Sequence, residues 1–244
     1  MRFDLITVFP DFFRGPLDYG VVARARARGL IEVETHDLRA YTHDRHQTTD
    51  DRPDGGGEGM VMKIEPIYAC LERLLGAAER EKRAAASTRV VLLSAQGRVF
   101  HQALAREWAG LERLVLIAGR YEGVDERVAE YLADEELSIG DFVLSGGELA
   151  AALVLDAVAR LIPGVLGDPQ SAINESFAAA AGGEASGALD YPHYTRPPQF
   201  QGMAVPEILL EGNHAVIREW RLNKAREKTR RLRPDLMRLG RFYF

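Results

Sequence analysis

Three glycine-containing loops carry the residues best suited to bind a ligand. They are Leu92–Gly97, Gly119–Arg127 and Ser138–Glu148, and each lies at the end of an apolar segment typical of a strand. Glycine lets a backbone approach a ligand because no Cβ stands in the way, and ligands of open α/β sheets bind beyond the carboxyl ends of the strands. One such loop alone indicates only a tight turn, but three of them predict a single binding cleft.

Other ligand chemistries are less well supported. None of the loops matches the G-x-G-x-x-G or P-loop pattern, which disfavours a Rossmann dehydrogenase or an NTPase. His43, Asp44 and His46 lie in a polar loop, without a nearby cysteine and without the i, i+4 spacing of helical metal ligands. We therefore expect no metal site there.

Strands and helices alternate along the first two thirds of the chain. The expected strands are Arg2–Phe9, Ile31–Thr35, Arg89–Leu93, Leu114–Ala118 and Glu136–Ser138. The expected helices are Asp18–Arg28, Glu65–Arg83, Phe100–Trp108, Asp125–Tyr131 and Glu148–Leu161. This alternation predicts an α/β fold with a mostly parallel sheet.

The last third has a different composition. Phe177–Leu189 is rich in Ala, Gly and Ser, as flexible linkers are, and Asn213–Arg233 predicts one long basic helix that Pro234 ends, with a short helix after it. We expect a ligand-binding α/β domain over residues 1–166, a linker over 167–188 and a small helical domain over 189–244.

The charge distribution points to an anionic partner of the C-terminal segment. The chain carries a net charge of −5, yet residues 213–244 contain ten Lys or Arg and three Asp or Glu, so this segment carries +7 and the rest −12. Such asymmetry predicts a basic tail that binds an anion such as nucleic acid. A solvated helix face would have the same composition, so charge alone leaves both interpretations open.

The single cysteine and the N-terminus indicate the cellular compartment in which the protein works. Cys70 cannot form an internal disulfide and predicts a buried thiol in a reducing environment. Met1–Leu5 shows no signal-peptide pattern, and no apolar run approaches the ~20 residues that span a bilayer. We expect a cytoplasmic protein without a membrane partner.

Seven segments together resemble one family, the bacterial tRNA (guanine-N1)-methyltransferases of the knotted SPOUT class. They are Thr42–His46, Asp50–Met60, Gly119–Arg127, Ser138–Glu148, Ile162–Leu166, Pro192–Pro197 and Gly212–Ala215. The similarity extends from Arg2 to about Met237. Collinear motifs over such a length are highly specific.

The resemblance implies a fold and a cofactor. The N-terminal domain would end in a deep trefoil knot, an exception to the rule against threaded chains, and S-adenosylmethionine would lie bent in it. The implied donor contacts are Leu92, Leu93, Gly119, Tyr121, Glu122, Ile139, Gly140, Asp141, Phe142, Val143, Leu144, Gly146 and Gly147. The enzyme would be a homodimer with active sites shared between subunits, and its target would be the guanosine at tRNA position 37, beside the anticodon. The resemblance also leaves room for Mg²⁺.

Two residues would carry the chemistry by resemblance, Arg160 and Glu175. The family usually has Asp where this chain has Glu175, although the following Ser176 and Phe177 match. Ala95 stands where Pro is common and Phe142 where Tyr is common, and the segment after Phe177 is longer than expected.

The chemistry of the implied reaction asks for the same two residue types. Guanine N1 carries a hydrogen that a base must remove, and a cation near O6 would stabilise the charge that develops there. Two alternatives remain: an RNA-binding module without chemistry, which need not keep the glycine loops, and a related enzyme that methylates a ribose hydroxyl. The Asp50–Met60 and Pro192–Pro197 motifs argue against the second.

Overall fold

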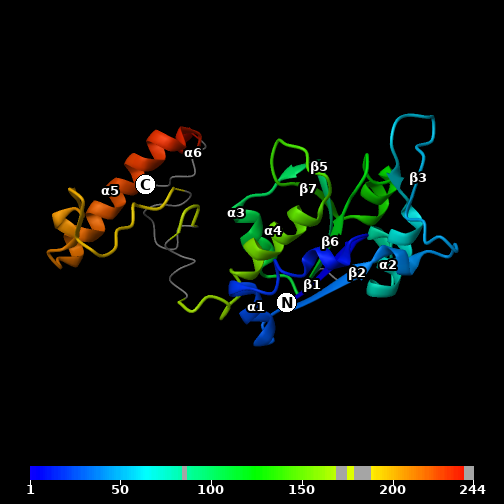
Figure 1. The fold of residues 1–244 in the computed structure, drawn as a ribbon, viewed down its shortest axis with the longest axis horizontal. Coiled ribbons are helices and arrows are strands. Elements are labelled where there is room, and N and C mark those ends of the chain that lie inside the picture. The colour runs from blue at the N-terminus through cyan, green and yellow to red at the C-terminus, as the bar shows by residue number, and fades with distance from the viewer. Residues whose placement is uncertain (84–86, 169–174, 179–187, 239–244) are drawn as a thin grey trace. The chain divides into compact units, whose positions relative to one another are not determined.

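The computed structural model describes residues 1–83, 87–168, 175–178 and 188–238. The chain divides into two compact units, Met1–Gly167 and Asp168–Phe244, which are described separately (Figure 1). Much of the expected linker, residues 169–174 and 179–187, lies outside the described residues.

A five-stranded parallel sheet forms the centre of the first unit. Its strands lie in the order β2-β1-β6-β5-β7, and every neighbouring pair is parallel. The bounds are β1 Arg2–Thr7, β2 Glu32–Asp37, β5 Thr88–Val99, β6 Arg113–Ala118 and β7 Glu135–Ser138. A separate two-stranded pair joins β3 (Asp50–Asp51) to β4 (Val61–Met62). The expected α/β fold with a parallel sheet is confirmed.

Helices cover both faces of this sheet (Figure 1). They are α1 Gly20–Ala27, α2 Ile64–Leu75, α3 Gln102–Trp108 and α4 Glu148–Ala159. One apolar cluster joins α1, α3 and α4 to one face, and a second joins α2 to the other. Residues along β6 alternate between the two clusters, as the period of two in a strand requires.

Two expected helices are shorter than the sequence pattern indicated. The helix expected over Glu65–Arg83 ends at Leu75, because Gly76 takes a left-handed conformation with φ of 76° and caps it. The helix expected over Asp125–Tyr131 is a single π-helical turn at Val128–Leu132. Short 3-10 turns lie at Pro10–Phe13, Leu38–Tyr41, Arg80–Lys82 and Glu207–Leu209.

Strand β5 is longer than expected and interrupted. It pairs with β7 through Leu93, leaves the register at Ser94–Gly97 and resumes at Arg98. A Cβ on Gly97 would overlap the backbone of Glu136 and Leu137, so only glycine allows this return. The bulge pushes residues 94–97 out at the carboxyl end of β5.

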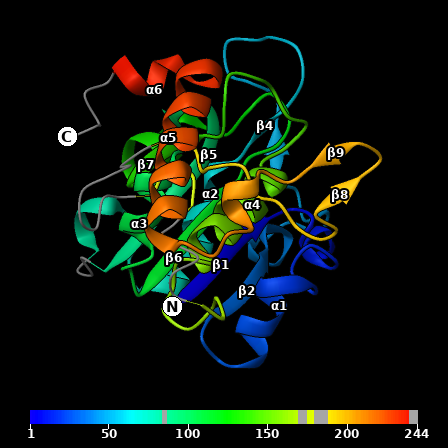
Figure 2. The same ribbon diagram turned by 90° about the vertical axis from the view of Figure 1, so that its left-hand side faces the viewer.

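The second unit contains a hairpin and two helices (Figure 2). Strands β8 (Gln199–Phe200) and β9 (Met203–Ala204) pair antiparallel. Helix α5 spans His214–Leu232 and α6 spans Pro234–Arg238, so the predicted long helix and the break at Pro234 are confirmed. The Asn213 side chain caps α5 by accepting a hydrogen bond from the Val216 amide at 3.4 Å.

Cys70 is fully buried in the α2 cluster. This burial, which the sequence predicted, raises the pKa of its thiol to about 12 and makes the thiol unreactive. Within the described part of the chain, no helix is long and apolar enough to cross a membrane.

Candidate active site

The bulge in β5 and the glycine loop after β7 enclose a small pocket at the carboxyl edge of the sheet. The cavity measures about 100 Å³. Of the residues expected at the donor, its lining includes Leu93, Ile139, Gly140, Phe142, Val143, Leu144, Gly146 and Gly147. Leu92, Gly119, Tyr121, Glu122 and Asp141 do not line it.

The third loop is joined to the pocket through the backbone. The Gly147 amide donates to the Gly119 carbonyl at 2.8 Å, and Gly146 forms a bridge with Arg120. A Cβ on Gly147 would lie 2.8 Å from Cα of Ala118, and one on Gly146 would overlap the Arg120 guanidinium. These glycines allow the start of α4 to pack directly against the end of β6. This packing alone requires glycine at both positions, whether or not a ligand binds there.

A buried acid at the start of α4 joins this helix to the ends of β1 and β6. Glu148, only 1% exposed, accepts a hydrogen bond from Thr7 Oγ1 at 2.7 Å and one from Arg120 Nε at 2.9 Å. Arg120 also donates to the Ser145 carbonyl at 3.1 Å, and its guanidinium lies 4.5 Å from the centroid of the Phe9 ring. This network fixes the loop that leads from β7 into α4.

Tyr121 and Glu122 face the Asp50–Met60 loop. The Glu122 amide donates to the Met60 carbonyl at 3.0 Å, and the Glu122 side chain crosses Gly59, where any Cβ would overlap it. Tyr121 has a positive φ of 61°, and burial together with the nearby Asp50 carboxylate raises its pKa. Two motifs that are distant in sequence thus dock on each other.

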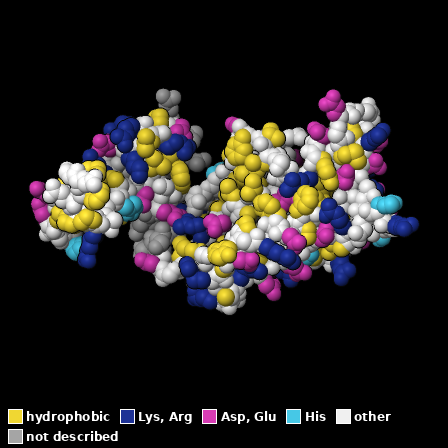
Figure 3. All heavy atoms as spheres, viewed as in Figure 1, with side chains coloured by type: hydrophobic (Ala, Val, Ile, Leu, Met, Phe, Trp, Pro, Cys, Tyr) yellow, Lys and Arg dark blue, Asp and Glu magenta, His cyan; other side chains and the backbone are white. Residues whose placement is uncertain are grey.

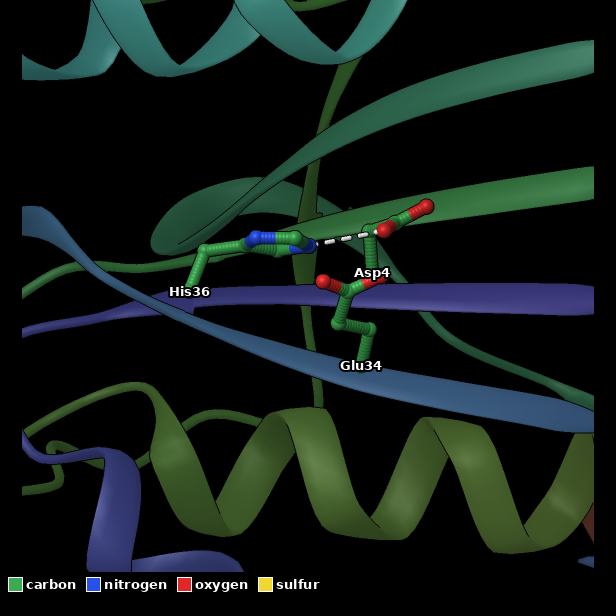
Figure 4. Close-up of side chains that lie close together, drawn as sticks. All are labelled: Asp4, Glu34 and His36. Atoms are coloured by element: carbon green, nitrogen blue, oxygen red, sulfur yellow. Dashed lines mark hydrogen bonds and ion pairs between the residues drawn. The ribbon is translucent and has the colours of Figure 1, made fainter.

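The only group of potential metal ligands among the described residues is Asp4, Glu34 and His36 (Figure 4). His36 Nε2 lies 2.7 Å from Asp4 Oδ1, and Arg113 Nε lies 2.6 Å from Asp4 Oδ2. Arg2 pairs with both Asp4 and Glu34. Because two guanidinium groups already neutralise these carboxylates, the cluster is an ion-pair network across β2, β1 and β6.

In the His43–His46 loop, Asp44 has a local structural role. Its carboxylate accepts hydrogen bonds from Thr48 Oγ1 at 2.7 Å and from the Thr48 and His46 amides. These bonds close the turn.

Comparison with known proteins now decides the family. The family model described as "tRNA (Guanine-1)-methyltransferase TrmD" matches residues 1–239. A protein of Koribacter versatilis named tRNA (guanine-N(1)-)-methyltransferase is 57% identical, covering 97% of this chain and 92% of its own length. Proteins of the same name from Geobacter sulfurreducens and Heliobacterium modesticaldum are 52% and 51% identical; they cover 97% and 99% of this chain and 91% and 86% of their own lengths. The chain belongs to this family.

The candidate catalytic residues of this TrmD family member lie in different units. Arg160 follows the last residue of α4 in the first unit and is half-buried. Helix α4 has 12 residues, so it is about 18 Å long. Because Gly147 starts it at the pocket, Arg160 lies at the end away from the pocket of its own chain.

Glu175 lies in the second unit, in an ordered turn. The Phe177 amide donates to the Ala188 carbonyl at 2.8 Å, and Ser176 Oγ accepts from the Asp190 amide at 2.9 Å. Arg233 lies over the Phe177 ring, 6.0 Å from its centroid. The Glu175–Phe177 motif therefore contacts residues 188–190 and Arg233, which follows the last residue of α5.

Sequence reasoning missed Thr7, Phe9 and the role of Arg120. Arg120 was inside a recognised motif, but nothing in its neighbourhood indicated a buried acid partner. Thr7 is 141 residues from Glu148, and its only local signal is a polar residue at the end of an apolar strand.

Proposed function

We propose that this protein transfers a methyl group from S-adenosylmethionine to N1 of guanosine 37 in tRNA, next to the anticodon. The observation that carries the proposal is the family match over residues 1–239. The glycine loops that such a donor site needs also meet at the carboxyl edge of one parallel sheet.

The lining of this pocket has the polarity that the adenosyl part of the donor requires. Apolar side chains such as Leu93, Leu137 and Ala150 line it together with backbone at the strand ends, which suits a flat heterocycle with polar edges. Its volume of about 100 Å³ is below the ~300–1,000 Å³ typical of ligand pockets. We therefore expect the loop with Phe142 and Val143, 54% and 88% exposed, to move outward on binding.

We also infer that the first unit is knotted. Strand β7 lies at the sheet edge beside β5, yet Gly146 and Gly147, which follow it, lie at the end of β6. The chain therefore crosses the end of β5 before α4 packs against β6 and β1. This return path supports a trefoil in residues 88–159.

A homodimer would complete the site. Leu149 and Leu153, 56% and 46% exposed, lie on one face of α4, and the helical period places Arg160 on the same face. Figure 3 shows hydrophobic side chains gathered over α4 and the β5–β7 edge. In a two-fold interface the same patch meets itself, so antiparallel α4 helices would bring Arg160 of the partner subunit to the pocket.

Two side chains would manage the proton and the charge. The bound donor would supply a methyl group that its sulfonium makes electrophilic, with the methyl carbon–sulfur bond breaking and a neutral thioether leaving. The Glu175 carboxylate accepts the N1 proton of guanine, so that the N1 electron pair is free to form the new bond. The Arg160 guanidinium donates hydrogen bonds to O6, where negative charge develops.

The second unit would hold the tRNA. Helix α5 carries Arg218, Arg221, Lys224, Arg226, Lys228, Arg230 and Arg231. Lys224 pairs with Glu227, whereas Arg218, Arg226, Arg230 and Arg231 make no ion pair among the described residues and remain available to phosphates.

The test is a methylation assay with a defined product. The protein is incubated with labelled S-adenosylmethionine and unmodified tRNA, the RNA is digested, and the labelled nucleoside is identified by mass spectrometry. We expect 1-methylguanosine, and no label in a control tRNA with adenosine at position 37. A methylated ribose, or RNA binding without any label, would contradict the proposal.

A further inference from the structure

A groove in the second unit has a lining unlike that of the donor pocket. The segment Tyr191–Pro198 and helix α5 enclose about 460 Å³. We call it the aromatic groove and define it by Tyr191, Tyr194, Arg196, Trp220 and Arg221, which all line it. These residues belong to one compact unit, so the groove does not depend on how the two units are arranged.

The groove combines planar side chains with aliphatic ones such as Val205, Leu209 and Ile217. The Arg221 guanidinium lies 4.7 Å from the centroid of the Tyr191 ring. The Tyr194 and Trp220 rings have centroids 6.4 Å apart and an interplanar angle of 55°. The two rings are therefore not stacked face to face. Tyr194 is 50% exposed. Ring faces therefore remain accessible to a flat ligand.

The combination of rings and arginines favours one class of partner. Proteins bind unstacked RNA bases by placing them against aromatic rings and guanidinium planes. The lining contains two arginines and no Asp or Glu, and the surrounding segment 213–244 carries a net +7. A purely apolar partner would leave these guanidinium groups without a counter-charge, whereas the phosphates flanking a base supply one.

We propose that the aromatic groove binds an unstacked nucleobase of the tRNA substrate. This rests on the proposed function, because that function supplies the RNA. This role differs from that of the cations on α5. Those cations attract the phosphates of any nucleic acid, whereas the groove would bind only a strand that carries an exposed base.

Tryptophan fluorescence gives a direct readout, because the chain has two tryptophans. Trp108 is 0% exposed in the first unit and Trp220 lines the groove. A short single-stranded oligoribonucleotide should quench the Trp220 emission, and the Trp220→Phe variant should lose this response. An abasic oligomer of the same length and charge should not quench. Equal quenching by the abasic oligomer, or none by either, would overturn the proposal.

Variants of Tyr194 test whether the ring matters for the intact substrate. Removing one stacking platform by Tyr194→Ser should weaken tRNA binding about 5- to 140-fold. Tyr194→Phe, which keeps the ring, should bind nearly as the wild type does. Phe200→Ser is the matched control, because Phe200 is 56% exposed in the same unit but does not line the groove. Circular dichroism confirms that each variant is folded.

The outcomes separate this proposal from the proposed function. If Tyr194→Ser binds tRNA as tightly as Phe200→Ser while 1-methylguanosine still forms, the groove proposal alone is wrong. If Tyr194→Ser changes only the oligomeric state, the groove is a protein contact and the proposal is also wrong. Absence of 1-methylguanosine from the wild-type reaction contradicts the proposed function, whatever the oligomers do.

Discussion

The two units of the chain present their functional groups in opposite ways. In the first, Glu148 and Gly147 are buried between strand ends and α4, backed by two apolar clusters. In the second, the buried residues among those described are mostly small, such as Ala188 and Ala225, and the groove rings are partly exposed. We infer that substitutions at the donor edge disturb fold and function together, whereas those in the second unit separate RNA binding from stability.

Removing the proposed base should have the largest effect. Glu175→Gln cannot accept the N1 proton, so we expect kcat to fall by about 10²- to 10⁴-fold while donor affinity is nearly unchanged. Single-turnover methylation and calorimetry measure the two quantities. Glu175→Asp keeps a carboxylate and should retain much of the rate. Asp168→Asn is the control, and wild-type turnover by Glu175→Gln would transfer the proposed role to Asp168.

Mixed dimers test whether Arg160 and Glu175 of one site come from two chains. Arg160→Ala and Glu175→Gln subunits are each inactive in this scheme. A mixed dimer regains one intact site if the two residues belong to different subunits, and none if they belong to the same one. A fully active monomer would contradict the dimer itself.

Breaking the buried network should mainly affect stability. Arg120→Ala leaves the Glu148 carboxylate, 1% exposed, without its cation, and such a loss costs about 3–5 kcal/mol. Arg127→Ala is the matched control in the same loop, because the Arg127 side chain is 61% exposed and an exposed ion pair contributes little to stability. Denaturation followed by circular dichroism compares the two variants, and similar losses would show that burial of Glu148 does not determine the cost.

The start of α4 should tolerate no added atom. Gly147→Ala places a Cβ 2.8 Å from Cα of Ala118, and we expect about 1–3 kcal/mol of destabilisation together with weaker donor binding. Gly167→Ala is the control, because a Cβ there meets nothing within 4 Å. If Gly147→Ala weakens donor binding with full stability, the glycine serves the ligand and not the packing of α4 on β6.

The sequence predicted the elements better than the contacts between them. The strands, α4, α5 and the common edge of the three loops followed from local patterns. The end of α2 was missed because the apolar pattern continued past Gly76, whose left-handed φ ends the helix. The return of β5 after Gly97 and the Thr7–Glu148 bond could not be predicted, because both depend on strands brought together from distant parts of the chain.

Acid should weaken the first unit through Asp4. Burial alone would raise the pKa of this carboxyl, but hydrogen bonds from His36, Arg113 and Arg2 outweigh it and hold the pKa below its usual value of 3.8. The stabilisation, on the order of 2 kcal/mol for such a group, is therefore fully present above pH ~4 and is lost as the pH falls below it. Asp4→Asn should flatten this part of the pH profile of unfolding, and an unchanged profile would contradict the assignment.

The smallest expected effect concerns the phosphate contacts of α5. Arg230 and Arg231 are exposed in the last turn of this helix. If each releases counterions on binding, the double substitution to Ala should lower the slope of log K against log salt by about 1.4–1.8. Between 50 and 200 mM salt, the variant should therefore lose about tenfold less affinity than the wild type does. Donor affinity should not change.

The control for this experiment removes the same charge from the other unit. Arg14 and Arg24 are exposed in the first unit, and Arg14→Ala with Arg24→Ala gives a chain of the same net charge as the α5 variant. If the salt slope depends on α5, only the α5 variant flattens it. If both variants lower the salt slope equally, tRNA binding depends on the net charge of the whole protein. The proposal that the second unit supplies the phosphate contacts would then be wrong.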